Sequence, residues 1–238
     1  MKFPTYKHET QKYLEGFKVV AGCDEVGIAP LAGPVVAATV ILDSQSIGRQ
    51  RSKNKWWYRV RDSKTTNEKE RTELIEFIKD NCVDFGIGVV SHETIDEINI
   101  HQAAMLAMQK SAEQLKVLPD YLFLDGLHRI KRFDFAQEPV VDGDVKILSI
   151  SAASIIAKVS RDKILAELHE QYPNYGFVKH KGYGTKEHRA ALKRFGVTPV
   201  HRTSFTFVQQ VIRSFCSFRN FEKNYGVILS EAKDLISV

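Results

Sequence analysis

Apolar runs separated by short polar stretches mark out the regular elements of this chain. Residues 18–23 and 34–42 are nearly continuous, β-branched apolar runs, which predicts two buried strands joined by the glycine-containing connection DEVGIAPLAG, with the acids Asp24 and Glu25 where the first strand ends. Further strands are predicted over 83–90, 121–124 and 139–141. Apolar positions at helical spacing predict helices after residue 67, over 94–115 with a break near Asn99, and over 151–170.

The order of these elements predicts an α/β fold built around a mixed sheet. Helical crossovers favour parallel strand pairs, whereas the tight connection between the first two strands favours an antiparallel pair. A chain of 238 residues is long enough for one good core. We therefore expect a main domain over residues 1–205 and, because apolar residues recur at helical spacing from 207 to 218, a C-terminal helical extension over 206–238 packed on it.

Composition narrows the class of protein. The chain has 34 Lys+Arg against 29 Asp+Glu, a net charge of +5, which suits a polyanionic partner but is also common among soluble proteins. The three cysteines show neither zinc-ligand spacing nor a disulfide pattern. Because the N-terminus lacks an apolar signal segment and no stretch is long enough to cross a bilayer, we expect a cytoplasmic protein without a membrane partner. We also expect a monomer.

Four acids carry the candidate chemistry. Asp24 and Glu25 are adjacent, Asp125 ends an apolar run, and Asp144 precedes a helical segment. A single Asp-Gly is more often a turn than a site, but an acid directly after a predicted strand recurs in three places. Carboxylates brought together from separate strands repel one another unless a cation lies between them. Metal-assisted phosphate chemistry is therefore the first hypothesis.

Two basic, aromatic-containing segments point to nucleic acid. Residues 172–205 combine many Lys, Arg and His side chains with three tyrosines, which is typical of nucleic-acid binding, although a solvated basic helix over 186–195 explains the charges equally well. The segment 43–66 reads as a basic loop containing Trp56 and Trp57. Those aromatics either stack on bases or anchor the loop to the core.

The motifs together resemble one known family. AGCDEVG with PLAGPVVAA, DSK at 62–64, LDG at 124–126, GDVK with AASIIAKVSRD, HKGYGTKEH and HRTSF occur in the order seen in ribonuclease HII, over roughly residues 19–207. The resemblance implies the ribonuclease H-like fold, a five-stranded mixed sheet flanked by helices. It also implies that Asp24, Glu25, Asp125 and Asp144 are catalytic ligands of a two-metal site for Mg²⁺ or Mn²⁺.

The same resemblance implies a substrate. Family members hydrolyse RNA–DNA hybrids and ribonucleotides embedded in duplex DNA, leaving 5′-phosphate and 3′-hydroxyl ends. A Gly-Arg-Gly turn reads the 2′-hydroxyl and a tyrosine stacks beyond the junction. Tyr183 matches the tyrosine, but the turn here is Gly27-Ile28-Ala29. If the backbone amides at 28 and 29 are still presented correctly, the enzyme cuts at single ribonucleotides, but weakly. If they are not, it cleaves longer RNA in hybrids without preference for the junction, or it loses activity altogether.

Three basic residues are candidates for contacts with the substrate, and two other functions remain as alternatives. Lys64, Lys181 and Arg202 are predicted to contact the phosphate backbone. One rival is a protein of the same fold that holds hybrids without cutting, but a pure binder gains nothing from a repulsive acid cluster. Another is a different two-metal nuclease or phosphatase, which would need neither Tyr183 nor the basic segment.

Overall fold

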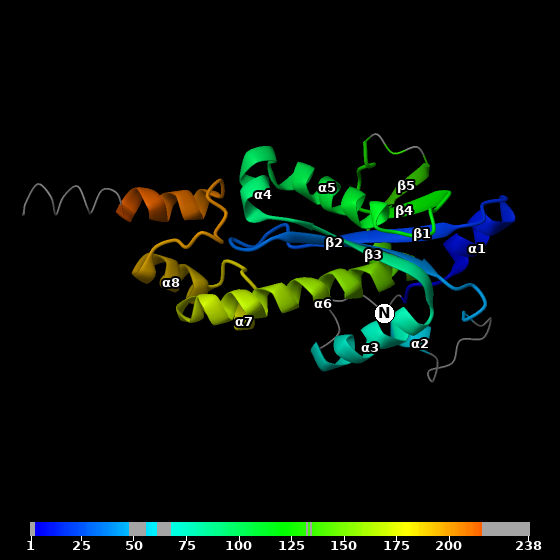
Figure 1. The fold of residues 1–238 in the computed structure, drawn as a ribbon, viewed down its shortest axis with the longest axis horizontal. Helices are drawn as coiled ribbons and strands as arrows, with labels where there is room; N and C mark the ends of the chain where they lie inside the picture. Colours follow the sequence, from blue (N-terminus) through cyan, green and yellow to red (C-terminus); the bar gives the residue numbers. More distant parts are fainter. Residues whose placement is uncertain (1–2, 48–55, 61–67, 132, 134, 216–238) are drawn as a thin grey trace, which may run out of the picture.

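A five-stranded mixed sheet forms the centre of the molecule (Figure 1). This computed structural model describes residues 3–47, 56–60, 68–131, 133 and 135–215. The sheet order is β3-β2-β1-β4-β5, with β1–β2 and β2–β3 antiparallel and β1–β4 and β4–β5 parallel, which confirms the predicted mixed sheet. The strands are β1 Val20–Val26, β2 Val35–Leu42, β3 Cys82–Val90, β4 Tyr121–Asp125 and β5 Ala136–Val140.

Helices cover both faces of this sheet. α4 and α5 lie on one face, and α3 and α6 lie on the other (Figure 1). The predicted break at Asn99 separates α4 from α5; Asn99 has φ 68° and its side chain accepts hydrogen bonds from the first amides of α5. The helices are α1 Lys7–Leu14, α2 Trp56–Arg59, α3 Glu68–Asp80, α4 His92–Ile98, α5 Ile100–Glu113, α6 Leu148–Gln171, α7 Phe177–His180 and α8 Lys186–Phe195, with 3₁₀ turns at Gly143–Val145 and Pro173–Tyr175.

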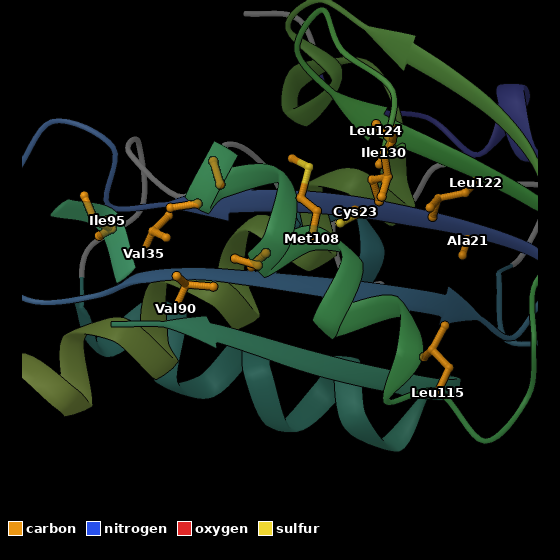
Figure 2. Close-up of a cluster of buried hydrophobic side chains, with 14 of the residues drawn as sticks. Ala21, Cys23, Val35, Val90, Ile95, Met108, Leu115, Leu122, Leu124 and Ile130 are labelled. Carbon is orange, nitrogen blue, oxygen red and sulfur yellow. The ribbon is translucent and has the colours of Figure 1, made fainter. Parts of the chain in front are cut away.

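Strand β2 is buried along its whole length and supplies side chains to two cores. Successive residues of a strand point to opposite faces, so Val35 and Ala37 join the cluster beneath α4 and α5, whereas Ala38 and Val40 join the cluster beneath α3 and α6. Figure 2 shows the first of these clusters, in which Met108 of α5 lies against the sheet. This double burial explains why the β2 sequence is apolar without alternation.

The first strand is longer than predicted. β1 continues through Asp24 and Glu25 to Val26, because these residues stay paired with β2 in the register Asp24↔Ala38, Glu25↔Ala37 and Val26↔Val36. Asp24 and Glu25 therefore lie within β1, near its C-terminal end, rather than after the strand. Alternation places Ala21 and Cys23 in the core beneath α5, which leaves Gly22 and Asp24 on the face covered by α6.

Two peripheral segments, around Trp56 and over residues 206–215, pack against the main domain. Trp56 and Trp57 pack against the core beneath α3 and α6, which favours the anchoring role for these aromatics. Residues 206–215 are helical, and Val208 and Val211 are buried against Leu165 and Leu192. The rest of the expected extension lies outside the described residues, so the boundary at 205 stays a prediction. Within the described part of the chain, no helix combines the length and apolarity needed to cross a membrane.

Candidate active site

Neighbouring strands bring the predicted acids to one edge of the sheet. The parallel register Cys23↔Leu124 places Asp24 beside Asp125, the last residue of β4. An Asp125 carboxylate oxygen accepts a hydrogen bond from the Gly143 amide at 2.7 Å. This bond fixes the start of the 3₁₀ turn that carries Asp144, so the third acidic segment is held against the second.

The site is crowded and electrostatically unfavourable for bare carboxylates. Asp24 is 5% exposed, and burial raises its pKa well above the usual range. The negative charges of Glu25, Asp125 and Asp144 raise that pKa further, while a hydrogen bond from Ser154 opposes the shift. Each of the other three acids therefore lies close enough to disfavour a second negative charge.

Burial also distinguishes the two acids of the Asp-Gly-Asp segment. Asp144 is buried at 6% exposure and interacts with Asp24, whereas Asp142 is exposed and has a left-handed backbone at φ 53°. Asp142 thus makes the turn and Asp144 faces the site. This placement fits the assignment of Asp144, rather than Asp142, to the acidic set.

The donor chemistry fits a hard divalent cation. Four carboxylates supply only oxygen atoms, which Mg²⁺ and Mn²⁺ prefer over nitrogen or sulfur ligands. In the part of the chain that the structure describes, no three His, Cys, Asp or Glu side chains are already drawn together as a ready coordination group.

A cleft of about 260 Å³ lies over the acids and the turn after β1. In this turn only Gly27 has a positive φ, of 102°; Ala29 does not, so its methyl group causes no backbone strain. The Ile28 side chain is half-buried and packs against the core beneath α4 and α5. The cleft is lined by Asp24, Glu25, Val26, Gly27, Ile28, Ala29, Asp125, Ser154, Lys158 and Tyr183.

Ile28 and Ala29, which line the cleft, also carry backbone amides that could donate to a ligand. Among the described residues, no acceptor is found for the amide N–H groups of Ile28 and Ala29. Tyr183, which is 40% exposed, lines the same cleft. The cleft therefore combines two backbone donors, a partly exposed aromatic ring and the three acids Asp24, Glu25 and Asp125.

The predicted phosphate contacts have different placements. The ammonium of Lys181 lies 4.0 Å from a carboxylate oxygen of Glu68, in a small basic pocket that also contains Arg71 and Lys163. Lys64 lies outside the described residues. Arg202 is completely buried and donates only to backbone carbonyls. A direct phosphate contact by Arg202 does not fit this placement, because its guanidinium has no face toward solvent.

Helix α6 contributes residues that the motif analysis did not assign. Ser154 hydrogen-bonds Asp24, Lys158 lines the cleft and forms an ion pair with Asp162 at 2.6 Å, and Arg161 lies beneath the turn after β1. Positions 154, 158 and 161 share one face of a helix. Polar residues at this spacing, beginning within the apolar first half of the helix, were the signal that could have revealed them.

The N-terminal helix adds a further unpredicted contact near the acids. The carboxylate of Glu9, fully buried in α1, accepts a hydrogen bond from the Ser149 amide at 2.9 Å. Ser149 is the second residue of α6, and the first amides of a helix have no partner within the helix. Glu9 therefore caps α6 shortly after Asp144.

Comparisons with known proteins show the family of this chain. The family model described as Ribonuclease HII matches residues 21–208 of the chain. The chain belongs to the ribonuclease HII family. Ribonuclease HII of Endomicrobium trichonymphae is 48% identical over 200 residues, covering 84% of this chain and 91% of that protein. Ribonuclease HII of Chlamydia caviae is 48% identical over 205 residues, covering 86% and 92%.

Solved structures support the same fold. The crystal structure of ribonuclease H2 from Pyrococcus horikoshii OT3 has a TM-score of 0.70 at 25% identity and covers 83% of this chain and 99% of that chain. The ribonuclease HII in the PCNA complex from Archaeoglobus fulgidus has a TM-score of 0.64 at 25% identity, covering 79% and 96%. As a ribonuclease HII, this protein is an endonuclease with ribonuclease H activity on RNA–DNA hybrids.

Proposed function

We propose that this ribonuclease HII is a Mg²⁺- or Mn²⁺-dependent enzyme that cleaves both RNA–DNA hybrids and ribonucleotides embedded in duplex DNA. The observation that carries the proposal is the shared cleft, which is lined by Asp24, Glu25 and Asp125 and also by Ile28 and Ala29, whose amides have no acceptor among the described residues. Asp144 interacts electrostatically with Asp24 at this site. Divalent cations bound there would supply an activated water and stabilise the negative charge that develops on the phosphate and on the departing 3′ oxygen. The products would carry 5′-phosphate and 3′-hydroxyl ends.

The residues divide the work between cation binding and substrate selection. Asp24 and Asp125, side by side on β1 and β4, would hold the cations together with Glu25 and Asp144. The amides of Ile28 and Ala29 would bind the 2′-hydroxyl, which distinguishes a ribonucleotide from its deoxy neighbour. Tyr183 would stack on the sugar beyond the junction, and Lys181, with Lys64, would contact the phosphate backbone.

Selection of single ribonucleotides should survive the altered turn in weakened form. Ala29 adopts an ordinary backbone conformation, so the turn does not need glycine at this position. What the turn lacks is the guanidinium of a Gly-Arg-Gly sequence, since Ile28 is apolar and packs on the core. The missing interaction is a charge-assisted phosphate contact worth about 1.5 to 3 kcal/mol.

Three duplexes test the proposal: all-DNA, an RNA–DNA hybrid, and DNA with one ribonucleotide. We expect Mg²⁺-dependent cutting of the second and third and none of the first. Asp125→Asn should abolish cutting and weaken Mg²⁺ binding, measured calorimetrically, while hybrid affinity is largely kept. Cleavage by the Asn variant at the wild-type rate would refute the acid assignment, and hybrid binding without cutting by the wild type would favour a non-cleaving binder.

We also propose that the protein acts as a cytoplasmic monomer with a helical extension over residues 206–238. Sedimentation of the full chain with and without hybrid would test the oligomeric state. A dimer at assay concentration would contradict it.

A further inference from the structure

Two arginines are buried beneath the active-site turn. Arg161 of α6 and Arg202 are both fully buried, and neither forms a salt bridge with a residue that the structure describes. Burying a guanidinium is costly unless its donors are all satisfied. A protein that keeps two such groups side by side must gain something that an apolar residue would not supply.

All of the observed hydrogen bonds of these guanidiniums go to backbone carbonyls. Arg202 donates to Gly27 at 2.6 Å, Ile28 at 2.9 Å, Gly33 at 3.0 Å and Pro34 at 3.2 Å. Arg161 donates to Pro34 at 2.9 Å, Ala32 at 3.1 Å and Lys181 at 2.9 Å. Apart from Lys181, these acceptors belong to residues 27–34, the connection between β1 and β2.

The turn is shaped to admit the guanidiniums. A Cβ atom added at Gly27 would lie 2.4 Å from Nε of Arg161, and the φ of 102° at Gly27 disfavours any side chain. At Gly182, an added Cβ would lie 2.7 Å from the Ala32 carbonyl oxygen. The two glycines thus let the turn, the arginines and the loop that carries Tyr183 come into contact.

Peptide geometry links these inward carbonyls to the outward amides. The described chain contains no cis peptide bond, and in a planar trans peptide the C=O and N–H groups point in opposite directions. The Gly27 carbonyl shares its peptide plane with the Ile28 amide, and the Ile28 carbonyl shares its plane with the Ala29 amide. By holding these two carbonyls, Arg202 turns the Ile28 and Ala29 amides toward the cleft.

We propose that Arg202, supported by Arg161, is a positioning residue for ribonucleotide recognition: it orients the turn amides from beneath and never touches the substrate. The inference rests on the proposed function, in which those amides bind the 2′-hydroxyl. It also explains how recognition persists without arginine at position 28. The orientation is imposed by a guanidinium delivered from residue 202, so it does not depend on the side chain at 28.

The test is a binding ratio measured in an Asp125→Asn background, so that substrates stay intact. Fluorescence anisotropy gives the Kd for an all-DNA duplex and for the same duplex with one ribonucleotide, in Mg²⁺. The methionine of Arg202→Met cannot donate to any carbonyl. The single ammonium of Arg202→Lys cannot reach all four carbonyls that Arg202 holds. The preference for the ribonucleotide is the Kd for the all-DNA duplex divided by the Kd for the ribonucleotide duplex. In the Met variant we expect this ratio to fall about tenfold, or to 1 if the wild-type ratio is below ten. The Lys variant should lose part of this preference. The affinity for the all-DNA duplex should be unchanged in both Arg202 variants.

A matched control separates positioning from general destabilisation. Ser111→Ala removes a buried hydrogen bond to Thr39 on the α5 side of the sheet, away from the turn. It should lower the melting temperature but keep the wild-type ratio. Folded Arg202 variants with the wild-type ratio would overturn the inference. A wild-type ratio of 1 would instead show that the selectivity in the proposed function is absent, and the inference would fall with it.

If neither Arg202 variant folds, a measurement on the protein with its native Arg202 tests whether this side chain is coupled to the turn amides. In NMR spectra, the guanidinium protons of Arg202 and the amides of Ile28 and Ala29 should shift together on adding the ribonucleotide duplex. They should not shift on adding the all-DNA duplex. Amide shifts without any change at Arg202 would contradict the coupling.

Discussion

Ile28→Arg should raise cleavage at single ribonucleotides. Ile28 lines the cleft, while its side chain is half-buried against the core that includes Phe205. An arginine stem can cover the same apolar surface and bring its guanidinium to a phosphate. A charge-assisted contact of about 1.5 to 3 kcal/mol corresponds to a gain of roughly 10- to 150-fold in kcat/KM.

The structure predicts that Ala29→Gly adds little to this gain. Ala29 has no positive φ, so glycine relieves no strain there and only increases the freedom of the unfolded chain. The double change Ile28→Arg with Ala29→Gly should therefore match Ile28→Arg alone. Loss of the half-buried Ile28 contact should cost about 1 kcal/mol of folding free energy, which a denaturant titration can detect.

The assay compares kcat/KM on a duplex containing one ribonucleotide with kcat/KM on an RNA–DNA hybrid. Val83→Arg is the matched control, since Val83 is 55% exposed on the distant edge strand β3 and the substitution adds the same charge. An equal gain in the control would mean that net charge, rather than a local phosphate contact, is responsible. No gain from Ile28→Arg would refute the reasoning about the turn.

Two further predictions follow from the site and its support. Tyr183→Ala should lower kcat/KM on the single-ribonucleotide duplex about tenfold, whereas Tyr183→Phe should keep it, since stacking needs only the ring; a loss in Tyr183→Phe would assign the role to the hydroxyl. Burial raises the pKa of Glu9 to about 7 from 4.5. The folded state then holds a proton that the unfolded state releases, so this group's contribution to stability is lost as the pH rises from about 4.5 to about 7, by up to about 3 kcal/mol. Denaturant unfolding of Glu9→Gln across this range should lack that fall, and parallel pH profiles of the two proteins would contradict it.

The amino-acid sequence by itself determined which segments form strands and helices and which acids follow them. Continuous apolar runs and helical spacing are local properties, so the order of elements, the break at Asn99 and the motif that relates the chain to ribonuclease HII were all readable along the chain. The end of β1 was misplaced, because its pairing with β2 overrides the polarity of Asp24 and Glu25. The strand predicted over 139–141 is β5, Ala136–Val140, the predicted loop over 43–66 contains the short helix α2, and α1 was not predicted.

The surroundings of the charged side chains could be seen only in the folded molecule. Arg202 looked like a phosphate ligand from its basic neighbourhood, yet it is buried and bonds Gly27 and Ile28, about 175 positions earlier in the chain. The cap that Glu9 places on α6 spans a separation of 140 positions. Whether a charged side chain points to solvent or into the protein depends on which distant segments pack around it, and no local pattern encodes that packing.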